Sequence, residues 1–242
     1  RFKDYDFEGS NIAVLLDILA YNTFQNNYYS NMVFSEMFLD SAQLRDSVVS
    51  HAKELNYLPR SMHSAQSTVS LSINAPDSPI SVTIPRGTKF KAVCGSEVFT
   101  FITNDSYTAY PNNGTYIVSG IDIYEGKTVK EFYTVTGDSL QEFPINNKNV
   151  DVNSVRVFVR DNVDVDSTKY EYSLKGNIYG VLENDNVFYI EPSTADKYKI
   201  AFGNNSFGVQ PVVGNVVEVE YRVTRGTEAN GATGIQIIDQ PD

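Results

Sequence analysis

The distribution of apolar residues divides the chain into two parts with different periods. From residue 10 to about residue 55 the pattern is helical, and between Ile12 and Tyr21 only Asp17 is polar. Ser10 is suited to cap this first helix. A surface helix has one apolar stripe, whereas this helix is apolar nearly all round and must be covered on several sides. It is therefore either a central core helix of this domain or a helix that packs into another subunit. In the second case its large aliphatic residues form a subunit interface: Ile12, Val14, Leu15, Leu16, Ile18 and Leu19.

A polar and aromatic stretch follows the first helix at residues 22–34, and residues 36–39 can form one more turn. Asp40, with Gln43 three residues later, is expected to cap a second helix. Pro59 is expected to end that helix, since proline cannot continue it. Its apolar face consists of Leu44, Val48, Ala52 and Leu55.

From residue 67 onward the hydrophobic period falls to two, which is typical of β-strands. Alternation with polar residues predicts antiparallel sheets with one face in water. Ten or more short strands without helices between them predict a sandwich or a barrel, or two in succession. The clearest alternating runs are 69–73 (VSLSI), 80–84 (ISVTI), 155–159 (VRVFV), 198–202 (YKIAF) and 217–221 (VEVEY).

The fold class predicted from these patterns is α+β, with a helical region at 1–62 and a β-rich region at 63–242. The asparagine-rich residues at 146–150 are the expected boundary between two β subdomains. The chain begins with Arg1 rather than methionine, so we expect it to be part of a longer polypeptide.

Composition excludes several classes of partner and site. The 30 acidic and 19 basic residues give a net charge of −11, which argues against nucleic acid and anionic membranes as partners. No apolar run reaches the roughly 18 residues of a membrane span. The single cysteine, Cys94, excludes an intramolecular disulfide and a cysteine-based zinc site, and its simplest interpretation is a small buried apolar residue.

Each candidate for catalysis or metal binding lacks a necessary part. Residues 137–140 (GDSL) match a hydrolase nucleophile motif, but that serine needs a downstream histidine and both histidines, His51 and His63, lie upstream. Residues 203–208 (GNNSFG) have the glycine spacing of a phosphate loop without its Lys-Ser/Thr pair, and are expected to form a hairpin loop. Three carboxylates, Asp161, Asp164 and Asp166, could hold calcium, but the glycine and glutamate of an EF-hand are missing. We therefore expect no enzymatic activity, no cofactor and no metal.

The 16 tyrosines remain as a chemical signal. Tyrosine buries area while keeping a polar tip, which suits protein interfaces and carbohydrate-binding faces. Ordinary packing accounts for most of them, and a receptor- or glycan-binding module stays an alternative function.

Three stretches of the chain form an ordered set of motifs that covers residues 6–232. The first stretch is 6–10 (DFEGS), 17–23 (DILAYNT), Glu36, 38–42 (FLDSA), Arg45, 47–49 (SVV) and 55–59 (LNYLP). The second is 82–90 (VTIPRGTKF). The third is 202–204 (FGN), 207–208 (FG), 214–217 (GNVV), 221–226 (YRVTRG) and 229–232 (ANGA). In this order they resemble the wedge subunit encoded by gene six of T-even-type contractile-tailed phages, which is related to the baseplate J-like family.

This resemblance implies a structural subunit of the virion's tail baseplate, assembled in the cytoplasm of the bacterial host. It also implies two copies per wedge, which contact each other and other wedge proteins. The family has no catalytic residues to transfer, so its motif residues are interpreted as turn-forming positions. These structural turn residues are Pro85, Gly87, Gly203, Gly208 and Gly226.

Overall fold

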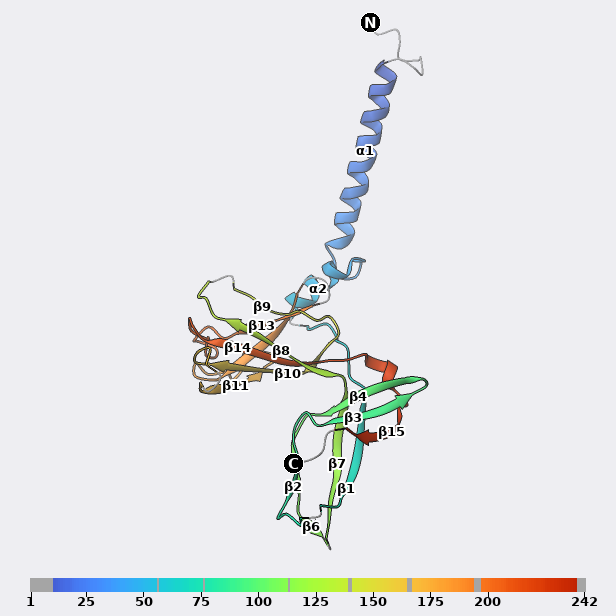
Figure 1. The fold of residues 1–242 in the computed structure, drawn as a ribbon. Helices are drawn as coiled ribbons and strands as arrows, with labels where there is room; N and C mark the ends of the chain where they lie inside the picture. The colour runs from blue at the N-terminus through green and yellow to red at the C-terminus, as the bar shows by residue number, and fades with distance from the viewer. Residues whose placement is uncertain are drawn as a thin grey trace. The chain divides into compact units, whose positions relative to one another are not determined.

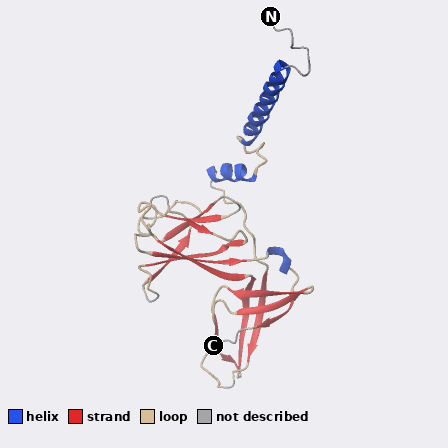
Figure 2. Ribbon diagram, turned by 45° about the horizontal axis from the view of Figure 1, so that its top comes forward, coloured by secondary structure: helices blue, strands red, loops and turns tan. Residues whose placement is uncertain are grey.

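The structure is a computed structural model that describes residues 11–55, 57–75, 77–112, 114–138, 141–164, 167–193 and 197–238. Contacts divide the chain into two compact units, Arg1–Pro59 and Arg60–Asp242. The first unit is helical and the second consists mainly of antiparallel strands (Figures 1 and 2). The predicted α+β class, with helices before the β structure, is confirmed.

Helix α1 (Asn11–Glu36) is longer than the sequence pattern predicted. The polar stretch at 22–34 continues the helix, because its side chains make hydrogen bonds one turn back along it. Thr23 Oγ1 donates to the Leu19 carbonyl at 2.8 Å, and Asn26 Nδ2 donates to Asn22 Oδ1 at 2.8 Å. These local bonds occupy polar groups that would otherwise compete with the helical backbone. The cap expected at Ser10 lies outside the described residues.

Helix α2 spans Arg45–Glu54, and the prediction that Asp40 caps it is wrong. Its N-cap residue is Leu44, which offers no side-chain acceptor. The carboxylate of Glu36, at the end of α1, instead accepts hydrogen bonds from the N–H groups of Gln43 at 3.0 Å and Leu44 at 3.1 Å. The Gln43 bond is the main reason that the pKa of Glu36 lies below its ordinary value. A carboxylate there also complements the helix dipole.

The second unit contains fifteen described strands in three sheets and one short 3-10 helix, η1 (Gly226–Ala229). The six-stranded sheet has the order β1-β7-β4-β3-β15, with β6 beside β7, and forms a half-barrel. Its strands are β1 (Gln66–Ile73), β3 (Lys89–Cys94), β4 (Glu97–Thr103), β6 (Pro111–Asn112), β7 (Thr115–Glu125) and β15 (Thr233–Ile237). A two-stranded sheet pairs β2 (Val82–Ile84) with β5 (Tyr107–Ala109).

The seven-stranded sheet has the order β8-β14-β10-β11-β12-β13-β9 and forms a nearly closed barrel. Neighbouring strands are antiparallel except β11 and β12, which are parallel. The strands are β8 (Lys127–Thr134), β9 (Phe143–Ile145), β10 (Val150–Arg160), β11 (Lys169–Leu174), β12 (Val187–Pro192), β13 (Tyr198–Phe202) and β14 (Val216–Val223).

The barrel is an insertion within the half-barrel. The chain leaves the half-barrel after β7, at Gly126, and returns to it after β14, at Thr224. The subdomain boundary expected at 146–150 does not coincide with these crossings, because residues 146–149 join β9 to β10 within the barrel sheet. An asparagine-rich turn between two strands of one sheet has the same composition as a linker, so composition alone does not separate them.

Side chains, not backbone bonds, bring the two edges of the barrel together. The Tyr133 hydroxyl on β8 donates to the carbonyl of Pro144 on β9, and its ring packs edge-on against Phe143 at 5.9 Å between centroids. Burial raises the pKa of Tyr133, and so does the Glu131 carboxylate, whose Oε2 lies 2.8 Å from the hydroxyl and competes for the same proton. The phenol therefore stays protonated and keeps this bridge over the physiological range.

Each barrel has its own apolar core, as alternation predicted. Phe90, Ile121 and Ile123 are fully buried in the half-barrel. Val157 and Val217 are fully buried in the closed barrel. Burial of each such side chain contributes roughly 1.5–3 kcal/mol.

The polar side of β14 is not in water, which contradicts the expectation of one wet face. Every residue of the strand except Val223 is buried, including Glu218, Glu220 and Arg222. The adjacent strands supply oppositely charged partners to these side chains, so they are covered without being left unpaired.

Candidate functional site: an exposed apolar helix and a charged barrel face

Helix α1 carries a row of exposed apolar side chains that is a candidate interaction surface. Of its six proposed interface residues, Ile12 is half-buried and the other five, Val14, Leu15, Leu16, Ile18 and Leu19, are between 48% and 58% exposed. No residue of α1, all of which the structure describes, is buried. Large aliphatic side chains in such a continuous array are typical of a surface that another protein covers.

The exposed apolar surface continues through the part of α1 that sequence inspection did not assign to a helix. Phe24, Tyr28 and Met32 are all exposed. Val14, Tyr21 and Tyr28 recur every seven residues, a spacing that places them near one face of a helix. That spacing is the signal by which the longer helix could have been found.

Each histidine has a hydrogen-bonding partner within its own unit. His51 Nε2 lies 2.9 Å from the Glu36 carbonyl, and His63 Nδ1 lies 3.3 Å from Asn153 Nδ2. Cys94 is half-buried, and its thiol donates to the Asn230 carbonyl.

The remaining motif candidates lie partly outside the described residues. The serine of the 137–140 motif and Asp166 of the acidic loop belong to that undescribed part. Within the described ranges, no three His, Cys, Asp or Glu side chains are close enough to hold a metal ion. None of the described helices is long and apolar enough to cross a lipid bilayer.

Glu218 is the centre of a charge cluster on the outer face of the closed barrel. Its fully buried carboxylate accepts ion pairs from Lys130 at 3.0 Å, Arg160 at 2.8 Å and Lys169 at 2.9 Å. Burial alone would raise the pKa of Glu218, but the bonds from the three cations outweigh it and hold the pKa at about 2.

Arg222 joins segments of both barrels where the chain crosses between them. It is 3% exposed, and its Nη2 donates to the Asp151 carboxylate at 2.9 Å. Its Nε donates to Ser64 Oγ and its Nη1 to Asn104 Oδ1, both at 2.7 Å. Burial opposes the charge of Asp151, but Arg222 and Ser64 lower the pKa of this carboxyl, so the pair stays ionised.

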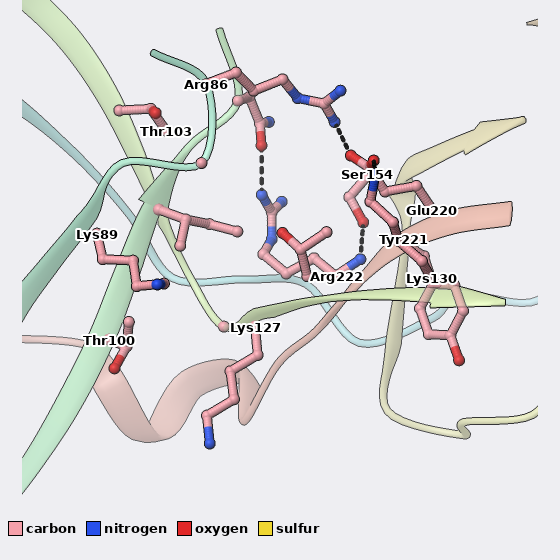
Figure 3. A pocket seen from close by; sticks show the side chains of 15 residues that line it. Arg86, Lys89, Thr100, Thr103, Lys127, Lys130, Ser154, Glu220, Tyr221 and Arg222 are labelled. Atoms are coloured by element: carbon pink, nitrogen blue, oxygen red, sulfur yellow. Dashed lines mark hydrogen bonds and ion pairs between the residues drawn. The ribbon is translucent and has the colours of Figure 1, made fainter. Parts of the chain in front are cut away.

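A cavity of about 570 Å³ lies beside this crossing (Figure 3). Its lining combines half-barrel residues such as Arg86 and Lys89 with barrel residues such as Lys127, Lys130 and Arg222. Sequence inspection did not predict this cavity, because these residues are far apart in the chain and only strand pairing brings them together.

Glycine is required at the proposed turn positions for two different reasons, a positive φ angle or a lack of space for a Cβ atom. Gly87, Gly208 and Gly226 have positive φ angles of 86°, 92° and 65°, which favour glycine. Pro85 begins the turn that contains Gly87, and its carbonyl accepts the Thr88 N–H at 3.2 Å. Gly203 has no positive φ, but a Cβ there would lie 2.3 Å from the Gly208 carbonyl oxygen.

The 203–208 loop is not a hairpin, because β13 and β14 are not neighbours in the sheet. The loop folds back on itself, with the Asn205 N–H donating to the Gly208 carbonyl at 2.9 Å. The Gly208 N–H in turn donates to the Leu182 carbonyl at 3.0 Å, so two loops are joined.

We predict that Gly203→Ala and Gly208→Ala each lower the free energy of unfolding by about 2 kcal/mol or more. At residue 203 the added Cβ would clash with the Gly208 carbonyl oxygen, and at residue 208 alanine would be strained by the positive φ. Gly176→Ala is the matched control, since nothing lies within 4 Å of its added Cβ and its φ is not positive. Chemical denaturation of the three variants measures the difference. Equal stability of all three would show that the loop rearranges without loss.

Comparisons with known proteins agree with the motifs in the sequence. Residues 1–57 match the family described as "Baseplate wedge protein gp6-like, helical domain", and residues 64–126 match "Baseplate wedge protein gp6, domain II". Baseplate wedge protein gp6 of Enterobacteria phage T4 is 31% identical over 99% of this chain. The chain spans 38% of that relative's length. The chain belongs to the gp6-like family of baseplate wedge proteins, structural components of the bacteriophage tail baseplate.

Proposed function

We propose that this chain is an assembly subunit that joins a second copy of itself and other wedge proteins through α1, with two copies in each wedge. The carrying observation is the exposed apolar circumference of α1, which includes five large aliphatic side chains in six residues. Membership in a baseplate wedge family supports assembly with other wedge proteins. The comparisons support this structural role rather than a receptor- or glycan-binding module.

The proposal includes no catalytic role. His51 lies against the Glu36 carbonyl at the end of α1, and His63 lies against the Asn153 side chain. A structural relative in the T4 baseplate supports the same conclusion.

The aliphatic side chains of α1 would stabilise this association by leaving water. Each one that moves from water into an interface contributes roughly 1.5–3 kcal/mol. Burial of Val14 and Ile18 alone would therefore strengthen association by about 3–6 kcal/mol, or roughly 10²- to 10⁴-fold.

We predict that Val14→Asp or Ile18→Asp weakens self-association at least about 100-fold, because each places a charge in an apolar contact. Analytical ultracentrifugation of the purified chain measures the association, and thermal melting reports whether the β unit still folds. Asn27→Asp is the control, since it adds the same charge at an exposed polar position of the same helix.

The proposal would be overturned if the chain is monomeric at high concentration and binds wedge partners unchanged in both variants. If in addition both variants melt together with the β unit at lower temperature, α1 is a core helix of this chain. Equal weakening by Asn27→Asp would assign the effect to charge alone.

A further inference from the structure

Strand β1 forms one edge of the half-barrel sheet (Figure 1). It pairs with β7 on one side, and no described strand pairs with its other side. The N–H of Glu125, on β7, donates to the Ala65 carbonyl at 2.8 Å, so the backbone of residue 65 points toward β7. Backbone groups alternate in direction along a strand, so those of the even-numbered residues from 66 to 72 point away from β7. This outer edge presents a row of N–H and C=O groups that no described residue uses.

Other strand edges of the second unit are protected, as is usual in natural sheets. β15 has five residues and a bulge that includes Gly234, whose φ is 67°. The side chain of Tyr133 joins the barrel edges β8 and β9. β1, in contrast, has eight residues with no proline and no charged side chain. The extra residue of the bulge opposite Ser70 belongs to β7, so β1 itself is continuous and can accept a further strand.

The two faces of β1 determine which side chains a further strand would carry. On one face, Val69, Leu71 and Ile73 form a half-buried apolar row against the core of the half-barrel. On the other face, Thr68 Oγ1 donates to the carboxylate of Asp122, on β7, at 2.6 Å. This carboxylate is half-buried and forms no ion pair with a described residue. An added strand would therefore meet an apolar row on one face and a carboxylate without a cation on the other.

We propose that the β1 edge is a docking site for an extended, basic segment of a protein partner, which adds to the half-barrel as a further strand. Apolar side chains of this segment extend the apolar row, and a lysine or arginine on its other face pairs with Asp122. The added strand lies two strand spacings, about 10 Å, from β7. A lysine and an aspartate side chain that extend toward each other over the short Thr68 span this distance.

The charge of the chain favours a basic partner over a second copy. The net charge of −11 attracts a cationic segment and repels another acidic chain. A second copy paired at the same edge would also bring its own Asp122 to the same face of the sheet. The edge lies in the β unit and the proposed self-association uses α1, so the two proposals fail independently. We expect Val14→Asp to leave binding at β1 unchanged.

The test uses the full chain and a fluorescently labelled octapeptide in which valine alternates with threonine, with lysine at one central threonine position. Fluorescence anisotropy measures the binding. We expect saturable binding that weakens at least about tenfold when alternate amides of the peptide are N-methylated, because the methyl groups replace the donors that pair with a strand edge. Replacement of the lysine by glutamate should weaken binding about tenfold, because of repulsion from Asp122.

Variants of the chain locate the site. Ser70→Pro removes an outward N–H without removing a bond to β7, and we expect it to weaken binding at least about tenfold. Asp122→Asn keeps an oxygen for Thr68 but removes the charge, so the lysine and glutamate peptides should bind equally. Asp161→Asn makes the same charge change at an exposed position between β10 and β11, and should keep the preference for lysine. Thermal melts report whether each variant is folded, and the N-methylated peptide tests the edge even if Ser70→Pro is not.

The proposal is wrong if the lysine peptide does not bind, or if the N-methylated peptide binds as tightly, since backbone pairing would then play no part. It is also wrong if Asp161→Asn loses the preference for lysine as fully as Asp122→Asn, which would indicate general charge attraction. If Ser70→Pro abolishes self-association of the chain in analytical ultracentrifugation, the occupant of the edge is a second copy and not a basic partner.

Discussion

Replacement of Arg222 by methionine is expected to lower the free energy of unfolding by about 3–5 kcal/mol, because it leaves the buried Asp151 carboxylate without its cation. Asp151 would keep only the bonds from Ser64 and its own turn, which do not carry a full positive charge. Asn104 and Ser64 would also lose a donor each. Chemical denaturation at neutral pH measures the loss.

Arg225→Met is the matched control for this result. Arg225 lies three residues further along and pairs with Glu97 at 2.6 Å and Glu228 at 2.7 Å, but its side chain is 49% exposed. Water can solvate its partners once it is removed, so we expect a much smaller loss. If the two methionine variants were equally stable, the buried pair would contribute no more than a surface pair.

Replacement of Glu218 by glutamine is expected to lower the free energy of unfolding at neutral pH by about 3 kcal/mol, because Lys130, Arg160 and Lys169 would then lose the buried carboxylate that they share. Glu171→Gln is the control, since Glu171 also pairs with an arginine, Arg156, but its side chain is 50% exposed. Equal melting temperatures for the two variants would show that solvent compensates the three cations.

The same carboxylate predicts a pH dependence with a definite sign. Its pKa is about 2 in the folded chain against an ordinary value of 4.5, so folding favours the ionised form. This contribution is fully present above pH 4.5 and is lost as pH falls from about 4.5 towards 2. Thermal melts over that range should therefore show a steeper loss of stability in the unaltered chain than in Glu218→Gln.

Local sequence patterns were sufficient to predict the structural features that depend only on residues close together in the chain. The apolar run at residues 12–21 correctly predicted a helix, which lies within α1. Alternation in runs such as 217–221 correctly predicted strands, and the glycine at 87 correctly marked a turn with positive φ. The ordered motifs at 82–90 and 221–226 were specific enough to indicate the family.

Local patterns were insufficient where a distant residue supplies the partner. Asp40 was the natural cap by spacing, yet Glu36, seven residues before Gln43, reaches that N–H because α1 runs longer than its apolar part. The asparagines at 146–149 resembled a linker, and only the presence of β9 and β10 in the same sheet shows that they connect two of its strands.

The sequence by itself therefore determined the α+β class, the order of helices before strands, the apolar helix and the family. Periodicity and motif order depend on the order of residues along the chain, so they can be read without knowing the tertiary contacts. Only the tertiary structure decided that the polar side of β14 is buried, that Arg222 joins the two barrels and that five cations share one cavity. Each of these depends on strands such as β8, β10 and β14 lying side by side, and the alternation within one strand does not specify which strands will be its neighbours.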